Sequence, residues 1–348
     1  MPTKPPVATM AEIAKEADVA VATVSKVLNG RPGVGAEKRD LILKLLDQHG
    51  YQRRGGQTRK PARLIDFVMR GIDTPWATQM LVGAEDEASR AQVGLVVSSS
   101  HGRLVGNKLW LDRLAERHSD GVVVVASRIQ DGVDLGLARL RVPYVLVDMV
   151  GTPPPGAMAV GCTNSTGGRD ATDHLIELGH RRIAMIIGPR DLACSQERLD
   201  GYRAALARAD IQLRPDYVQV GDFEMTGGYR AALRLFDLAE PPTAIFAGSD
   251  LQAYGVFRAA AERGVSIPDD LSVVGFDDVP MCEWMTPHLT TIRQPLEEMA
   301  RQAMRTVLAM AYQNTVPVAP KIELATRLIV RGSTAPPPQA RPEAPEED

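Results

Sequence analysis

Six polar or aromatic side chains have the chemistry to bind a small hydroxyl-rich molecule. They lie at predicted strand ends or on the helices that follow. Aspartate oxygens accept hydrogen bonds from hydroxyl groups, arginine donates through a two-pronged guanidinium, and tryptophan offers a flat apolar face. The candidates are Trp76, Asp148, Asn164, Arg198, Asp250 and Asp277. Arg198 is the strongest, because an arginine that faces a core needs a charged partner.

Several of these candidates also have a purely structural interpretation. Asp250 and Asp277 could cap the helices that follow their strands, and Trp76 could pack in a core. The residue types alone leave these alternatives open.

Catalytic chemistry is not indicated. Asp277 and Asp278 are adjacent, and neighbouring residues at a strand end point to opposite sides, so they cannot act together on one bond. The six histidines lack metal-ligand spacing, and the cysteines at positions 162, 194 and 282 match neither a disulfide framework nor a zinc site. No nucleotide-binding glycine motif and no nucleophile elbow is present. We therefore expect no enzyme, no metal and no cofactor.

From residue 64 onward, apolar runs alternate with helical stretches. LIDFVM, GVVVVAS, YVLVDM and SVVGFDD are typical of buried parallel strands. Helices are predicted over 78–91, 167–178, 195–209, 226–238 and 251–263. Alternation over some 270 residues predicts an α/β body with two doubly wound parallel sheets, whose ligands bind at the carboxyl ends of strands.

Residues 10–51 predict a separate all-α head. Thr9 can cap a first helix over 10–17, with Glu12 at the capping-box position. A second helix is predicted from 20 or 21 to 29 and a third over 36–48. In the second helix Val24 and Val27 share an inner face, so the opposite face is free to enter a DNA groove.

The charge distribution separates the head from the rest. Residues 1–60 hold eleven Lys and Arg against six Asp and Glu, a net charge of +5, whereas the remainder carries −8. A basic head on an acidic body suits DNA binding joined to another task. The N-terminus MPTKPPVATM lacks the apolar core of a secretory signal and no run is long enough to span a membrane, so we expect a cytoplasmic protein.

The run ATMAEIAKEADVAVATVSKVLNG resembles the opening of the LacI/GalR family of transcription regulators. HLIELGHRRIA, ERLDGYRAAL, PTAIFAGSDLQA, DLSVVGFDD and PHLTTIRQP extend the resemblance to about residue 333. It implies a helix-turn-helix head (1–51), a hinge (52–63) and a body (64–333) shaped like a two-lobed periplasmic binding protein. Lobe 1 would comprise about 64–161 and 292–322, and lobe 2 about 162–291 and 323–333. The proline-rich, acidic tail (334–348) is expected to be disordered.

The resemblance also assigns roles to individual residues. It implies that Val21, Ala22 and Lys26 contact base edges and that Thr9, Thr23, Ser25, Asn29 and Tyr51 contact phosphates. Lys26 can donate to guanine acceptors, whereas for Ser25 and Asn29 a polar helix surface is the alternative. The implied effector contacts are Trp76, Asp148, Asn164, Cys194, Arg198, Phe223, Glu224, Asp250 and Asp277.

The hinge, QRRGGQTRKPAR, departs from the family pattern. It lacks the leucine that such hinges insert into the minor groove, and Gly55-Gly56 argues against a stable helix. Arg53 and Arg54 are expected to enter a narrow minor groove or follow phosphates; a solvated basic linker is the alternative.

The leading hypothesis is a homodimeric repressor of carbohydrate-utilisation genes that binds a near-palindromic operator. A small sugar between the lobes would change the operator affinity. The alternatives are a purine-type corepressed regulator, in which Phe223 could stack on a base, and a sugar-binding carrier, against which the basic helical head argues.

Overall fold

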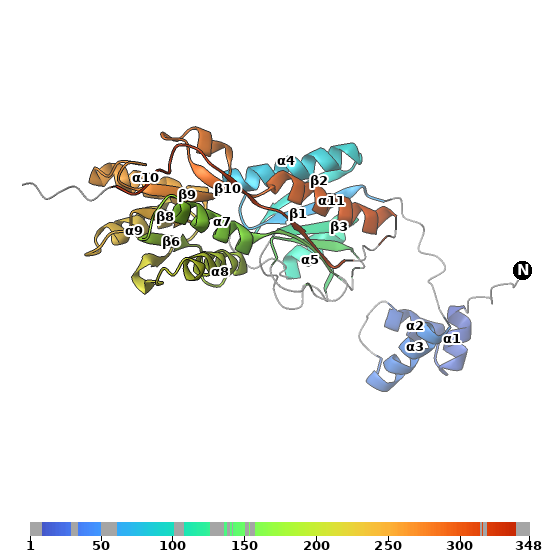
Figure 1. Cartoon of the computed structure of the whole chain (residues 1–348). Helices are drawn as coiled ribbons and strands as arrows, with labels where there is room; N and C mark the ends of the chain where they lie inside the picture. Colours follow the sequence, from blue (N-terminus) through green and yellow to red (C-terminus); the bar gives the residue numbers. More distant parts are fainter. Residues whose placement is uncertain are drawn as a thin grey trace, which may run out of the picture. The chain divides into compact units, whose positions relative to one another are not determined.

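The computed structural model divides the chain into two compact units, residues 1–61 (the head) and residues 62–348 (the body), shown in Figure 1. It describes residues 9–28, 34–49, 61–100, 108–125, 136–137, 140, 142–149, 153, 157–313, 315 and 319–338. In these ranges, no helix has the length and hydrophobicity that crossing a membrane demands. Nor do three or more His, Cys, Asp or Glu side chains there gather in a way that could hold a metal ion.

The described part of the head folds into α1 (Met10–Glu16), α2 (Val21–Leu28) and α3 (Ala36–Gln48). The side chain of Thr9 accepts from the amide of Glu12, and the Glu12 side chain accepts from the amide of Thr9, which is the predicted capping box. One small core joins the three helices and consists of Ile13, Ala14, Ala17, Val24, Val27, Ile42, Leu45 and Leu46.

The body contains two sheets, each of six strands in the described part of the chain, and the predicted α/β class is confirmed. Sheet 1 has the order β11-β5-β4-β3-β1-β2, and all its pairs are parallel. Its strands are β1 (Leu64–Met69), β2 (Gly94–Ser99), β3 (Gly121–Val125), β4 (Tyr144–Val147), β5 (Met158–Cys162) and β11 (Lys321–Leu324).

Sheet 2 has the order β12-β10-β9-β8-β6-β7, and its β10–β12 pair is antiparallel. Its strands are β6 (Ile183–Ile187), β7 (Val218–Val220), β8 (Ala244–Ala247), β9 (Ser272–Asp277), β10 (Thr290–Arg293) and β12 (Arg327–Ile329). Below, lobe 1 means sheet 1 with its helices, and lobe 2 means sheet 2 with its helices.

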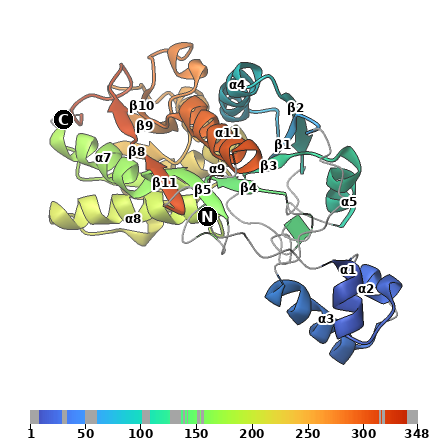
Figure 2. The same ribbon diagram turned by 90° about the vertical axis from the view of Figure 1, so that its right-hand side faces the viewer.

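Helices cover both faces of each sheet (Figure 2). In lobe 1, α4 (Pro75–Arg90) and α11 (Leu296–Tyr312) lie together on one face, and α5 (Lys108–Arg117) packs on the other. In lobe 2, α7 (Asn164–Glu177) and α8 (Ala193–Arg208) form one layer, and α9 (Met225–Phe236) and α10 (Asp250–Arg263) form the other. Short 3-10 turns follow at Pro215–Tyr217 and Pro280–Glu283.

Within the described residues the chain passes between the lobes three times: after β5, after β10 and after β11. Two of these crossings are joined to each other. The amide of Thr163 donates to the carbonyl of Leu324 (3.1 Å), and the hydroxyls of Thr163 and Thr326 lie 3.0 Å apart. The third crossing carries Gln294, and all three lie where strands of both sheets end.

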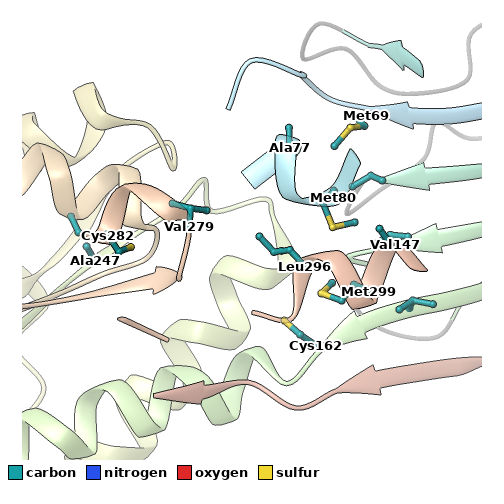
Figure 3. Packing of buried hydrophobic residues seen from close by; sticks show 14 of the residues in the cluster. Met69, Ala77, Met80, Val147, Cys162, Ala247, Val279, Cys282, Leu296 and Met299 are labelled. Carbon is teal, nitrogen blue, oxygen red and sulfur yellow. The ribbon is translucent and has the colours of Figure 1, made fainter. Parts of the chain in front are cut away.

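One continuous group of buried apolar side chains extends over both lobes. Met80, Leu296 and Met299 belong to its lobe 1 part, and Val279 and Cys282 belong to its lobe 2 part (Figure 3). The lobe junction is therefore supported by apolar packing on the α4/α11 side.

Two helices begin three residues earlier than predicted. The prediction started them at residues 78 and 167, but α4 starts at Pro75 and α7 at Asn164. The Thr74 side chain caps α4, and a proline in the first turn fixes its φ in the helical range. Trp76 and Asn164 consequently lie in first helical turns, where amide groups point outward.

The expectation of disorder from residue 334 was wrong for the first tail residues. Thr334 lies 2.9 Å from the His174 ring, and Ala335 exchanges two hydrogen bonds with the Ser272 hydroxyl. The Ala335 carbonyl also lies 2.9 Å from Nε2 of the buried His180. The amino-acid composition predicted disorder. It could not indicate these contacts, because they are made by backbone groups and by partners more than sixty residues away in the sequence. Residues 339–348 lie outside the described ranges.

Candidate functional site

The outward face of α2 carries the residues predicted to contact bases. Val21 is 45% exposed, Ala22 and Lys26 are exposed as well, and Thr23 and Ser25 are half-buried. Val24 and Val27 on the opposite face are buried in the head core. The helix therefore presents one cationic donor flanked by small apolar side chains, which is a surface that fits a major groove.

The turn before α2 is held by the third helix. Asp18 has a φ of 50°, and its carbonyl accepts from the Lys38 ammonium at 3.4 Å. At the far end of the head, the ring of His49 lies 2.6 Å from the Glu16 carboxylate. These contacts join α3 to the turn before α2 and the residue after α3 to α1.

Thr9 is engaged within the head itself. Its hydroxyl and its amide both donate to the Glu12 carboxylate, at 2.9 and 2.6 Å. A phosphate at Thr9 would therefore have to displace Glu12. Four other predicted DNA contacts lie outside the described residues: Asn29, Tyr51, Arg53 and Arg54.

In the body, Arg198 is the centre of a buried cluster. It is 4% exposed, its Nε donates to Asn164 Oδ1 (2.9 Å), and its Nη1 donates to the Gly248 carbonyl (2.5 Å). The guanidinium carbon lies 3.7 Å from the centre of the Phe276 ring. The predicted charged partner is Asp277, whose Oδ1 is 4.0 Å from Nη1.

Glycines in α7 and α8 bring Arg198 and Asn164 together. A Cβ on Gly201 would lie 2.1 Å from the Ser165 carbonyl oxygen, and one on Gly168 would lie 2.3 Å from the Arg198 carbonyl oxygen. The two helix backbones are therefore in direct contact, which a larger residue at either position would prevent.

Asp277 and Asp278 diverge at the end of β9, as the strand geometry predicts. Asp277 Oδ1 accepts from Gln294 Nε2 at 2.6 Å, and burial raises the pKa of Asp277 well above its ordinary value. Asp278 instead pairs with Arg331 at 2.7 Å and also with Arg293. The two carboxylates thus face different partners.

Asp148 is the lobe 1 residue of this cluster. Burial raises its pKa to about 6, against the lowering effect of Arg198 and of a hydrogen bond from Cys194. Its Oδ1 atom is buried and has no hydrogen-bond partner in the described part of the chain. A buried acceptor without a donor is costly, so a ligand donor at this atom would bring a large gain.

Strained backbone marks the same region. Asp148, Phe223, Asp277 and Asp278 have φ angles of 61°, 69°, 123° and 60°, although none is glycine. Such conformations cost on the order of 1–3 kcal/mol each and persist where the surrounding structure enforces them.

Asp250 has a different position from that expected of a ligand contact. It is fully buried, and its oxygens accept from the Val279 amide (2.9 Å), the Thr291 hydroxyl (2.6 Å) and the Cys282 thiol (3.0 Å). The cap of α10 is Ser249, so Asp250 is not a cap either. Burial raises its pKa to about 6. Asp250 joins the ends of three strands beneath the cleft.

Three predicted contacts lie further from Arg198. Phe223 lies over Gly188, with its ring centre 5.3 Å from the Arg198 guanidinium carbon. Glu224 is exposed as a whole, but partial burial of its carboxylate raises its pKa. The negative charges of Asp222 and then of Asp73, which belongs to lobe 1, raise this pKa further. Trp76 is half-buried and packs against the main core, which favours the packing interpretation.

A cavity of about 450 Å³ lies beside the cluster. It shares Asp277 and Gln294 with the cluster and is lined further by Gln79 of α4 and by Leu296 and Glu297 of α11. Arg198 itself is 4% exposed and does not line this cavity.

The sequence interpretation missed Gln294 and Cys162. The thiol of Cys162 lies 3.3 Å from Gln294 Oε1, so Gln294 holds both a lobe 1 strand end and Asp277. A usable signal existed: Gln294 follows the run LTTIR, whose apolar and β-branched residues are typical of a strand. It also missed Phe276, which is hidden in an apolar run.

Comparison with known proteins gives two family matches. Residues 9–54 match the model for bacterial regulatory proteins of the lacI family, and residues 172–334 match a periplasmic binding protein-like domain. The chain is 32% identical over 330 residues to the HTH-type transcriptional repressor CytR of Escherichia coli K12, covering 94% of this chain and 96% of that protein. It is also 32% identical over 335 residues to the HTH-type transcriptional regulator CelR of Thermobifida fusca (93% and 98%).

Among solved structures, a transcriptional regulator CelR–cellobiose complex superimposes with a TM-score of 0.71 at 31% identity, covering 94% of this chain and 99% of that one. The chain has a helix-turn-helix head and a two-lobed body, and these relatives match it over nearly its whole length. The chain belongs to the LacI family of bacterial regulatory proteins.

Proposed function

We propose that this LacI-family regulator represses carbohydrate-utilisation genes and that a small sugar bound between its lobes changes its operator affinity. The observation that carries the sugar assignment is the buried Oδ1 of Asp148, which lacks a donor among the described residues although the charge of Arg198 is near enough to lower its pKa. A sugar hydroxyl can donate to this oxygen while a second hydroxyl accepts from Arg198.

The contacts proposed for the sugar come from both sides of the cleft. Lobe 1 provides Asp148 on the strand end after β4. Lobe 2 provides Arg198, Asn164 and Asp277, with the Phe223 ring as an apolar face. Because the ligand bridges both lobes, it stabilises one separation of the lobes over another.

The regulatory step follows from two-fold symmetry. Two chains would present two heads to a near-palindromic operator, and the lobe separation would set the distance between the heads. Coupling between two such sites is typically about 1–3 kcal/mol, or about 5–150-fold in affinity. Operator DNA lies in the cytoplasm, and we place the protein there.

On DNA, Lys26, Val21 and Ala22 are proposed to read bases, and Thr23 and Ser25 to contact phosphates. Arg53 and Arg54, which lie outside the described residues, are proposed to enter the minor groove. Replacing both by alanine should weaken operator binding and reduce the slope of log affinity against log salt by about 2. An unchanged slope would assign them to a solvated linker.

A purine or nucleoside effector is the second candidate. Phe223 favours it, because its ring lies 5.3 Å from the Arg198 guanidinium carbon and offers a face on which a base could stack. A sugar-binding carrier is a weaker alternative, because a carrier has no use for a DNA-binding head. Deleting residues 1–60 would leave a carrier's function unchanged but abolish that of a regulator.

The deciding experiment is a thermal-shift screen of the full chain with mono- and oligosaccharides, cellobiose and ribose included, and with purines and nucleosides. A ligand at 100 times its Kd stabilises the protein by about 2.7 kcal/mol. Stabilisation by sugars, lost in Arg198→Lys, supports the proposal. Stabilisation by purines or nucleosides alone would replace it with the second candidate.

A further inference from the structure

The chain enters the body through a set of contacts that sequence patterns did not indicate. The amides of Ala62 and Arg63 donate to the two oxygens of Asp120, at 3.2 and 2.7 Å. The Tyr312 hydroxyl donates to Asp120 at 2.8 Å. Asp120 also donates its own amide to the Leu64 carbonyl (2.8 Å), so this carboxylate fastens the first body residues from one side.

Arg63 fastens them from the other side. Its Nη2 donates to the Ala91 carbonyl (2.6 Å) and its Nε to the Gln92 carbonyl (2.9 Å) at the C-terminal end of α4. A cation is favourable at a helix C-terminus, where carbonyl groups lack partners. The guanidinium carbon also lies 5.7 Å from the centre of the Tyr312 ring. Arg63 has a φ of 55°, a strained value that these contacts maintain.

Both helices that meet at Arg63 begin at the lobe junction. Gln79, in the first turns of α4, and Leu296, at the start of α11, line the cavity beside the cleft. Tyr312, which contacts Arg63, is the last residue of α11. A helix of this length spans about 25 Å, so α11 extends from the cleft to the entry point of the chain.

The two helices are in direct backbone contact, so they move together. A Cβ on Gly83 of α4 would lie 2.1 Å from the carbonyl oxygen of Glu297 on α11. Arg301 on α11 also pairs with Asp86 on α4 at 3.0 Å. Interfaces packed this closely transmit displacement because they cannot deform continuously.

We infer that Ala62, Arg63, Asp120 and Tyr312, here called the entry clamp, position the DNA-binding head by tying its linker to the C-terminal ends of α4 and α11. The inference rests on the proposed function and deepens it. With the clamp closed, the spacing of two heads in a dimer follows the lobe 1 helices. With the clamp broken, the linkers gain freedom and the heads adapt to different spacings.

Spacing preference on DNA tests this without an identified effector. Duplexes are selected from a random pool by the full-length chain, and a second set carries one base pair inserted at the centre, which shifts a half-site by about 3.4 Å. The unmutated chain should prefer the original spacing by about tenfold or more. Tyr312→Phe removes only the hydroxyl, and Asp120→Asn removes the charge that holds the two amides.

Each clamp variant should reduce the spacing preference by about fivefold or more, and the double variant should add little because both act on one unit. Arg90→Gln is the matched control: it breaks an exposed pair with Asp86 on the last turn of α4 and should keep the preference. Thermal unfolding shows whether each variant is folded. A purely structural defect lowers affinity for both spacings equally.

The outcomes are distinct. A spacing preference that persists in folded Tyr312→Phe and Asp120→Asn overturns the clamp and leaves the proposed function standing. An unmutated chain that binds both spacings equally has the same consequence. A full-length chain that selects no DNA overturns the proposed function, and the clamp with it.

Discussion

The two lobes have the same strand order, but they place different numbers of polar side chains in the cluster around Arg198. Lobe 2 supplies a preassembled cluster around Arg198, with Asn164 and Asp277 already in place. Lobe 1 supplies one carboxylate, Asp148, and holds the entering chain through the polar contacts of the entry clamp. On the proposed function, lobe 2 would recognise the ligand, whereas lobe 1 would sense it and act on the linker.

The largest contrast should come from two arginines, one in each lobe, that pair with buried carboxylates. Arg198→Met leaves the Asp277 and Asp148 carboxylates without their cation, and removal of one partner of a buried pair costs about 3–5 kcal/mol. Arg117→Met does the same to the fully buried Asp66 in lobe 1, at lower cost because Ser119 still donates to it.

Urea unfolding of the full chain and ligand titration separate the two effects. Arg198→Met should lose stability and ligand binding together. Arg117→Met should lose stability alone. Loss of binding in Arg117→Met would contradict the assignment of recognition to lobe 2.

Asp148→Asn should have the opposite effect on stability. The pKa of Asp148 is raised from 3.8 to about 6, so the folded state holds a proton more tightly than the unfolded state. Stability from this group is complete below pH 4 and is lost as pH rises through about 6. The variant should therefore be more stable than the unmutated chain at pH 7.5, by about 2 kcal/mol, and not at pH 4.

Measurement of the urea midpoint at both pH values checks this prediction. An equal effect at pH 4 and pH 7.5 would show that burial does not destabilise the ionised carboxylate. Ligand affinity should fall in the variant, because its amide oxygen is a weaker acceptor.

A pair of glycine substitutions should then separate recognition from transmission. Gly201→Ala forces α8 away from α7, and Gly83→Ala forces α4 away from α11, each costing about 1–3 kcal/mol. Gly201→Ala should weaken ligand binding, because Arg198 moves relative to Asn164. Gly83→Ala should spare ligand binding and reduce the spacing preference on DNA. The reverse result would exchange the roles of the lobes.

The smallest expected effect concerns acid pH and the tail. Burial lowers the pKa of His180, and likewise that of His174, below the ordinary value of 6.5. Neutral rings are thus favoured in the folded state, and their contribution to stability is present above pH 6.5 and lost as pH falls. His180→Gln should flatten the decline in stability between pH 7 and pH 5. A decline as steep as in the unmutated chain would assign it to other groups.

Sequence patterns predicted the helices and strands that depend on the local spacing of apolar residues. The helices of the head were placed closely because Val24 and Val27 in one helix, and Ile42, Leu45 and Leu46 in the next, repeat at helical spacing. The sheets followed from the apolar runs. The need of a buried arginine for a charged partner singled out Arg198. The resemblance to known regulators added the two-lobed architecture.

What the sequence could not indicate depends on long-range pairing. Gln294 bridges Cys162 and Asp277, which are 132 and 17 residues away. Asp120 reaches Tyr312 across 192 residues. The three donors to Asp250 could not be predicted, because they come from segments that meet only when β8, β9 and β10 align.

If the proposed sugar donates to the Asp148 oxygen that lacks a partner among the described residues, ligand binding is linked to the exchange of protons with solvent. Near pH 6 this carboxyl group is protonated in a fraction of the molecules, and a hydroxyl that donates to it favours the ionised form. Binding should therefore release a fraction of a proton, and the calorimetric heat of binding should vary with the ionisation enthalpy of the buffer. A cell whose cytoplasm acidifies would then need more of the same effector to obtain the same response.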